Sequence, residues 1–279
     1  MGRQFSAPTT MLLDNGIFSH SEFAKGAILR KEILWGGSNQ VSHIHGIRRK
    51  TPNNDVQFQK HVDALPTIGR LIRERLLGAR DYKEIWRERM RFRPLIPFGN
   101  ALHGCIIEEC EPAIDSGKFA QTTDITEYFA KGGRKDRKAG LAPGPANQIA
   151  FFKFLCSLTH EAVDVLIAHA EPLRLSVFEV ESLRDIGWFQ FLCERSGSPE
   201  NYPDVFHLWT AERNGLDILL TLDNGLPELV SRVRKEKGQK IKIKTEILRP
   251  LELLDLLEVR DRDPIGLDED RFYYLHELC

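Results

Sequence analysis

The 279-residue sequence has no excess of charge of either sign and no long apolar run. Its 39 lysines and arginines nearly balance its 40 aspartates and glutamates, and the net charge is −1. The molecule as a whole therefore does not attract nucleic acid, and any such binding needs a local basic patch. No segment approaches the roughly 20 apolar residues that span a bilayer, and the first residues lack the apolar segment of a signal peptide. We expect a soluble protein of the cytoplasm with no membrane partner.

The five cysteines include no CxxC pair, and no internal repeat is visible. An odd number of scattered cysteines favours free thiols in a reducing compartment over a disulfide framework. Two loose groups of potential zinc ligands lack the tighter paired spacing of zinc sites, so packing or solvent exposure is their expected role; they are His43 with His45, and His103 with Cys105 and Cys110. The length allows one large domain or two small ones, and we favour a single domain over 1–279 that carries insertions.

Apolar segments of strand and helix type alternate along the chain. Strands are expected at 10–14, 79–82, 105–107, 173–177, 216–223 and 241–247. Helices are expected at 17–24, 65–77, 83–90, 147–169, 181–195, 204–214, 226–234 and 251–257. Strands that alternate with helices indicate a mostly parallel sheet covered on both faces, which is a three-layer α/β/α fold.

Two segments are expected to be insertions in this fold. Residues 28–50 alternate apolar and polar positions around a Gly-Gly-Ser-Asn turn, which predicts a β-hairpin. Residues 94–146 are rich in proline and contain the basic run KGGRKDRKAG, so they are expected to be irregular. Charge runs are usually solvated faces. This run is nevertheless the first candidate to hold a phosphate backbone, through Arg134, Lys135, Arg137 and Lys138.

Three aspartates occupy positions that chemistry could use together. Asp14 and Asp223 each follow an apolar strand, and Asp204 lies in the first turn of an expected helix. Ligand sites of parallel sheets cluster beyond the carboxyl ends of the strands, so these acids could converge on a cation. Each acid also has a plainer interpretation. Asp204 could stabilise its helix, and Asp14 and Asp223 could be turn residues, since both precede an asparagine.

Three segments that contain these acids or follow them resemble the PIN domain family of nucleases. They are MLLDNGIFS, DVFHLWTAERNGLDILLTLD and IKIKTEILRPLELLDLL. The resemblance implies that acids at the ends of parallel strands hold a divalent metal, and it places the first, third and fourth of these acids at Asp14, Asp204 and Asp223. The family's second acid is a glutamate on the helix after the second strand. That position falls on Glu84, and the alternatives are Glu88, Glu108 and Glu109.

The function that the resemblance implies is a nuclease dependent on Mg²⁺ or Mn²⁺, an endoribonuclease-like hydrolase whose substrate is RNA, with DNA as the alternative. Clustered carboxylates repel one another, and a hard cation relieves that repulsion and can activate water against a phosphodiester. The main alternative is an inactive PIN-like scaffold that binds partners through its insertions. Another metal hydrolase, such as a phosphatase, is also left open, as are endo or exo action, an inhibitor protein and a homodimer.

Overall fold

The computed structural model describes residues 8–21, 33–35, 44–48, 56–82, 102, 104–119, 145–235, 243–263 and 272–274. The chain forms two compact units whose segments alternate along the sequence. The first unit is made of Met1–Glu109, Asp217–Asn224 and Glu246–Cys279, and the second of Cys110–Leu216 and Gly225–Thr245. Because neither unit is one continuous stretch, this division does not test the expectation of a single domain, which stays a prediction.

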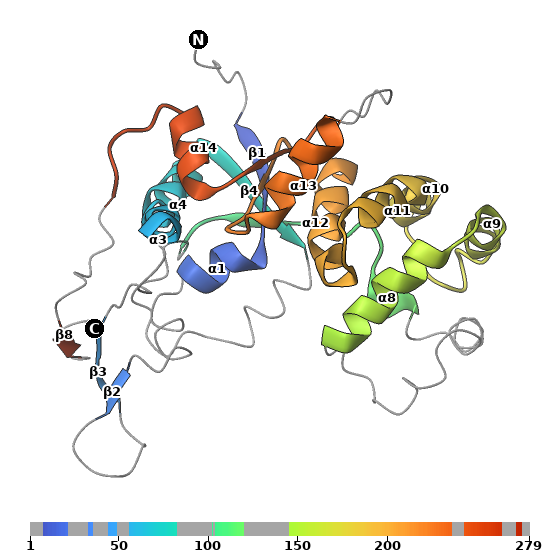
Figure 1. The fold of residues 1–279 in the computed structure, drawn as a ribbon, viewed down its shortest axis with the longest axis horizontal. Coiled ribbons are helices and arrows are strands. Elements are labelled where there is room, and N and C mark those ends of the chain that lie inside the picture. The colour runs from blue at the N-terminus through green and yellow to red at the C-terminus, as the bar shows by residue number, and fades with distance from the viewer. Residues whose placement is uncertain are drawn as a thin grey trace. The chain divides into compact units, whose positions relative to one another are not determined.

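A five-stranded, all-parallel sheet is the main feature of the first unit (Figure 1). Its strands, in spatial order, are β5 (Ile107–Cys110), β4 (Leu77–Tyr82), β1 (Thr9–Leu13), β6 (Ile218–Leu220) and β7 (Glu246–Leu248). The expected α/β class with a parallel sheet is thus confirmed, and the architecture is consistent with three α/β/α layers. The expected strand at 105–107 is β5, at the edge of this sheet.

The strands β1 and β6 are largely buried, and most of their side chains are apolar. Met11, Leu12 and Leu13 of β1 are buried, as is all of β6. A parallel strand in the middle of a sheet is covered on both faces, which explains continuous apolar runs in place of alternation. Asp217, which directly precedes β6, accepts hydrogen bonds from the backbone N–H and the hydroxyl of Thr10 in β1, at 2.9 and 2.8 Å. This contact fixes the register of β1 and β6 at their amino ends.

A layer of helices accompanies the sheet in the first unit. These are α1 (Asn15–Ser21), α3 (Val56–Asp63), α4 (Leu65–Arg73) and α14 (Pro250–Leu256). Helix α4 packs against β4, and α1, α3 and α14 each contact α4 (Figure 1). The helix expected at 65–77 ends early, because Arg75 adopts a positive φ of 59° that turns the chain into β4.

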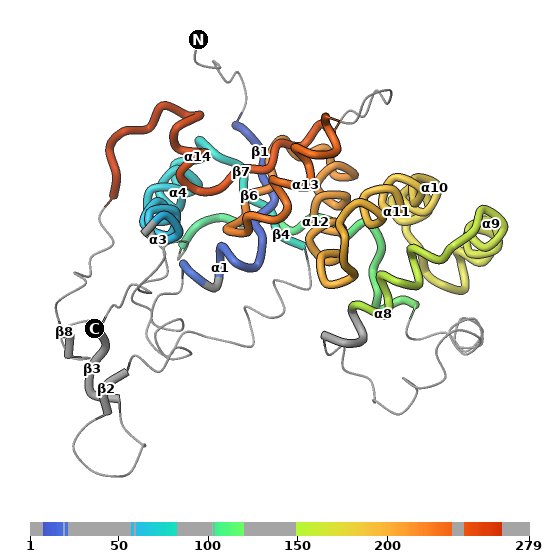
Figure 2. Tube along the Cα trace, viewed as in Figure 1, coloured from blue at the N-terminus to red at the C-terminus, as the bar shows by residue number. Residues whose placement is uncertain are grey.

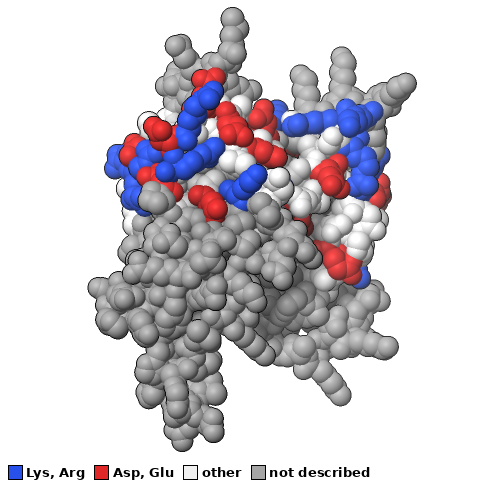
Figure 3. Space-filling model, turned by 60° about the vertical axis from the view of Figure 1, so that its left-hand side comes forward, with Lys and Arg blue, Asp and Glu red and all other residues white. Residues whose placement is uncertain are grey.

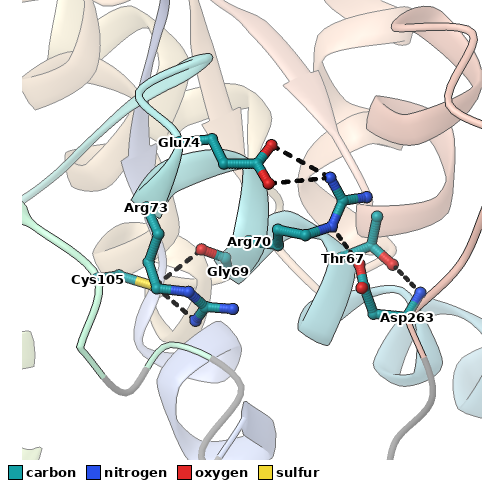
Figure 4. Close-up of polar contacts among 7 residues, drawn as sticks. All are labelled: Thr67, Gly69, Arg70, Arg73, Glu74, Cys105 and Asp263. Atoms are coloured by element: carbon teal, nitrogen blue, oxygen red, sulfur yellow. Dashed lines mark hydrogen bonds and ion pairs between the residues drawn. The ribbon is translucent and has the colours of Figure 1, made fainter.

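The segment after α14 is held against α4 by polar contacts (Figure 4). Arg70 Nε donates to Asp263 Oδ2 at 2.8 Å, and the backbone N–H of Asp263 donates to the buried hydroxyl of Thr67 at 2.8 Å. On the same helix, the thiol of Cys105 donates to the carbonyl of Gly69 at 3.0 Å. Burial raises the pKa of this thiol. Cys105 therefore has a packing role here.

A second, antiparallel sheet contains three short strands. They are β2 (Ile33–Trp35), β3 (Ile44–Arg48) and β8 (Phe272–Tyr274), with β3 in the middle. The pairing of β2 with β3 is the antiparallel pair expected within 28–50. The third strand, β8, comes from the other end of the chain and was not predicted.

The second unit is built from helices. They are α6 (Ser116–Phe119), α8 (Pro145–Ser157), α9 (His160–Ala168), α10 (Val177–Arg184), α11 (Ile186–Arg195), a 3₁₀ turn η2 (Pro199–Asn201), α12 (Tyr202–Arg213) and α13 (Gly225–Arg234). Figure 2 follows their trace. Within the ranges described, no helix is long and apolar enough to cross a membrane.

Three expectations for this unit were wrong. The helix expected at 147–169 is two helices, because Thr159 accepts the N–H of Ala162 at 3.3 Å and starts α9 as its N-cap. The strand expected at 173–177 does not form. Ser176 and Glu179 instead bond each other's backbone N–H groups in a capping box that starts α10. Helix 181–195 is likewise divided, at Asp185.

Aromatic side chains form the core of the second unit. Phe152 lies 5.1 Å from Phe206, and Phe189 lies 5.1 Å from Trp209, measured between ring centroids. Trp209 is fully buried, and its indole N–H donates to Asp185 at 3.3 Å. The run FFKFL at 151–155 contributes its three phenylalanines to this core, and all three are buried.

Candidate functional site

The order of the strands identifies one edge of the sheet as the place for a ligand site. From β1 in the centre, the chain adds β4 and β5 on one side and β6 and β7 on the other. The direction of strand addition therefore reverses between β1 and β6. In open α/β sheets, ligands bind beyond the carboxyl ends of the strands at such a switch point. Asp14 directly follows β1, and Thr221 directly follows β6.

Thr221 links two of the predicted site acids. Its hydroxyl donates to Oδ2 of Asp14 at 2.7 Å and accepts the backbone N–H of Asp223 at 3.0 Å. The backbone N–H of Asp14 extends the ladder between the strands by donating to the carbonyl of Leu220 at 3.0 Å. Thr221 is only 2% exposed, whereas Asp14 is half-buried and Asp223 is exposed. A buried hydroxyl thus fixes one carboxylate and positions the backbone of the other.

The first turn of α1 passes close to Asp14. A Cβ at Gly16 would lie 3.4 Å from Oδ2 of Asp14 and 4.0 Å from Cβ of Leu222. The carbonyl of Asp14 accepts the N–H of Ile17 at 3.0 Å, which is the turn role that the sequence allows for this residue. Its backbone serves the turn while its side chain contacts Thr221. The turn interpretation and the site interpretation of Asp14 are therefore compatible.

Asp204 lies in the second unit, in the first turn of α12. The helix begins after Asn201, whose side-chain amide donates to the carbonyl of Ser196 at 2.7 Å. Asp204 is thus three residues inside the cap, where a negative charge favours the helix electrostatically. Of the three predicted aspartates, the structure brings together Asp14 and Asp223.

The predicted second acid, Glu84, and its neighbour Glu88 lie outside the described residues. Glu108 and Glu109 were alternatives for the case in which their strand is the second core strand. Their strand is β5, and β4 stands between β5 and β1. Glu108 forms an ion pair with Arg80 at 3.0 Å, and its side chain is largely exposed. The position of β5 does not favour either glutamate as a partner of Asp14.

Sequence reasoning missed an acid in the strand beside β1. Asp81 is 0% exposed and lies near the carboxyl end of β4, where the register continued from Leu12 and Arg80 places it opposite Leu13. Its sequence signal is an acid close to the end of a strand, as at Asp14. Thr221 was missed as well, although a threonine two residues before a strand-end acid can bond that acid's backbone.

The residues present are compatible with a hard divalent cation. Within the described ranges, no group of three or more His, Cys, Asp and Glu side chains could hold a metal ion. The carboxylates of Asp14 and Asp223 nevertheless offer the oxygen donors that such ions prefer. Mg²⁺ commonly keeps several waters and uses only one or two carboxylates together with substrate phosphates. The donor set therefore fits an ion of this class that is completed by water and substrate.

The predicted basic loop lies outside the described residues, from Arg134 to Lys138. In the described part of the chain, lysines and arginines are interspersed with aspartates and glutamates on the face in Figure 3. This distribution agrees with the net charge of −1. The proposed contact of Arg134, Lys135, Arg137 and Lys138 with nucleic acid stays a prediction.

No protein-family model, curated protein or solved structure matches this chain. The comparisons therefore do not identify a family, and the resemblance to PIN domains stays a prediction.

Proposed function

We propose that this protein is a PIN-like, metal-dependent nuclease that hydrolyses phosphodiester bonds, with RNA as its main substrate. The observation that carries the proposal is the hydrogen-bonded link from Asp14 through Thr221 to Asp223, at the switch point of a parallel sheet. Ligand sites of this fold class lie at that position. The nature of the side chains, two acids held by a buried hydroxyl, favours a cation as the first ligand.

The residues have separate roles in this proposal. Asp14 and Asp223 would hold Mg²⁺ or Mn²⁺, and Asp204 and Glu84 would complete the acid set that the resemblance implies. When bound, the ion supplies a Lewis acid that polarises the phosphate and activates water. Thr221 fixes the orientation of the Asp14 carboxylate, because its hydroxyl donates a hydrogen bond to Oδ2 of that carboxylate. No side-chain nucleophile is needed, because water is the attacking group.

The direct test is cleavage of labelled single-stranded RNA and DNA by the purified protein with Mg²⁺, with Mn²⁺ and with EDTA. We expect cleavage with either metal and none with EDTA. Asp14→Asn and Asp223→Asn should each lower the rate by at least about 100-fold, since each removes a charged oxygen ligand. Asp204→Asn tests the third acid in the same assay. Preference for one polymer identifies the substrate class.

Asp217→Asn is the matched control. Asp217 precedes β6 and binds Thr10 at the amino end of the sheet, so the same change of charge occurs away from the carboxyl edge. This variant should lose stability but keep its cleavage rate at temperatures where it is folded. Equal loss of cleavage in Asp217→Asn and Asp14→Asn would contradict the proposal, because the effect would then follow stability and not the site.

The second acid can be assigned with a pair of variants. Glu84→Gln should abolish cleavage if Glu84 completes the site, and Glu88→Gln should then have little effect; the reverse result assigns Glu88. If the unmodified protein neither cleaves nucleic acid nor binds Mn²⁺ in calorimetry, the nuclease proposal fails. The inactive PIN-like scaffold, acting through its insertions, then becomes the better proposal.

A further inference from the structure

Three neighbouring strands place one residue each in a row at the carboxyl edge of the sheet. Asp14 donates its N–H to the carbonyl of Leu220, and Thr221 donates its N–H to the carbonyl of Leu248 at 3.1 Å. In a parallel ladder, a residue that donates to position j−1 lies opposite position j. Asp14 is therefore opposite Thr221, and Thr221 is opposite Arg249. Residues in register on parallel strands, about 4.8 Å apart, direct their side chains to the same face.

Arg249 keeps an extended backbone at this position, with φ −89° and ψ 157°. Its N–H donates to Oε2 of Glu252 at 2.8 Å. Two residues later, the N–H of Leu251 donates to Nδ1 of the buried His61 at 3.1 Å, and Pro250 between them is buried. The first contact fixes the backbone of Arg249 itself, the second fixes the backbone on its carboxyl side, and the ladder bond at Leu248 fixes the backbone on its amino side. The side chain of Arg249 therefore extends from a fixed backbone position, directly opposite Thr221 on the neighbouring strand.

The guanidinium of Arg249 has a donor that the protein leaves unused. Its Nε is shielded from solvent and makes no hydrogen bond in the structure as described. A buried donor without an acceptor is costly and rare in native proteins, and it calls for a ligand that supplies the acceptor. The missing acceptor is expected to be an anion, because a guanidinium presents several N–H groups that match phosphate oxygens.

We infer that Arg249 binds a phosphate group of the nucleic-acid substrate beside Asp14 and Asp223. This inference rests on the proposed function and deepens it. Two carboxylates repel a phosphodiester, and a fixed positive charge one strand away offsets that repulsion. The terminal N–H groups of Arg249 donate to the phosphate oxygens, and Nε gains the same acceptor when the side chain moves it out of its shielded position. Arg249 thereby orients the phosphate toward the two acids.

The test is binding of a fluorescent single-stranded RNA of random sequence to the full chain in EDTA, where no cleavage occurs. Arg249→Gln should weaken binding by about 10-fold to 100-fold, the effect of one charge-assisted hydrogen-bond pair. Arg249→Lys, which keeps the charge but lacks Nε, should recover only part of the loss. The control is Arg262→Gln, which removes an equal charge from an arginine already paired with Asp255 at 3.2 Å.

Salt dependence separates a phosphate contact from a structural role. Loss of one phosphate contact makes the slope of log K against log salt less negative by about 0.7 for a single strand. In the cleavage assay, Arg249→Gln should raise KM more than it lowers kcat. If the unmodified protein cleaves RNA, and Arg249→Gln keeps its affinity and its slope, the role of Arg249 is overturned while the nuclease proposal stands. If the unmodified protein neither binds nor cleaves nucleic acid, both fail together.

Discussion

The imidazole of His61 accepts the backbone N–H of Leu251 at 3.1 Å and so joins α3 to the start of α14. Nδ1 is the acceptor, so the ring presents its unprotonated nitrogen to the helix. His61 is only 6% exposed, and its partner is a backbone group in the first turn of a helix, where N–H groups lack partners within the helix. A side chain from one helix thus completes the cap of another.

Replacing His61 with phenylalanine removes the acceptor while keeping an aromatic ring of similar size. The N–H of Leu251 then has no partner in a partly buried place, and we expect the free energy of unfolding to fall by about 1–3 kcal/mol. Urea denaturation followed by circular dichroism measures this. The control is Lys60→Gln, at the neighbouring exposed position. This change should leave the midpoint of urea denaturation nearly unchanged. An unaltered midpoint in His61→Phe would show that the contact does not stabilise the fold.

If the protein is the nuclease proposed above, Thr221→Val should impair cleavage more than folding. Valine keeps the shape of threonine but cannot donate to Asp14 or accept from Asp223, so both acids lose their common support. We expect kcat to fall by about 10-fold to 100-fold, the range that misplacement of a catalytic group causes. Thr221→Ser keeps the hydroxyl and should retain most of the activity. Equal rates for the valine and serine variants would argue against a positioning role for the hydroxyl.

Glu179 stabilises the second unit from a buried position. It is 2% exposed, accepts the N–H groups of Asp115 and Ser176 at 3.0 and 2.7 Å, and forms an ion pair with Lys118. Glu179→Ala leaves these donors without an acceptor and should lower the free energy of unfolding by about 2–4 kcal/mol. Denaturation by guanidinium chloride measures the loss. Glu181→Gln is the control, since that exposed side chain makes one long ion pair, and it should change stability by less than about 0.5 kcal/mol.

The cysteines should differ in reactivity. A hydrogen bond from Cys193 lowers the pKa of the half-buried Cys156, whereas burial raises the pKa of Cys105. The thiolate is the reactive form, so a lower pKa gives Cys156 more of it at a given pH. Iodoacetamide at pH 7.5 should therefore label Cys156 before Cys105, as mapped by peptide mass spectrometry. Cys193→Ala removes the donor and should slow the labelling of Cys156. Faster labelling of Cys105 than of Cys156 would contradict the predicted order of reactivity.

The hydrophobic pattern of the sequence predicted much of this fold. It was wrong where side chains that cap helices compete with that pattern. Apolar residues on both sides of Thr159 continue a helical pattern, and only the N-cap chemistry of that threonine reveals the break between α8 and α9. At 173–177 the apolar content suggested a strand, yet Ser176 and Glu179 have the spacing of a capping box and start a helix. In both places, side-chain contacts to the backbone prevail over hydrophobic pattern.

The candidate site was predictable only in part, because its parts come from distant segments. Acids after apolar runs could be read from the sequence at Asp14 and Asp223, and the structure places them on either side of Thr221. The position of Arg249 could not be predicted, since it depends on the register of β6 and β7, which the sequence of either strand does not encode alone. The same holds for β8, whose partner β3 lies near the other end of the chain.

The order of the strands also bears on how the protein is made. Asp14 and Thr221 are 207 positions apart, and β7 is later still. When a ribosome has released β1 and β4, the neighbours that cover the other side of β1 have not been synthesised. An unpaired strand edge of this kind invites pairing with another chain until β6 has been synthesised. The link from Asp14 through Thr221 to Asp223 therefore comes into existence only after β6 has been synthesised, long after β1.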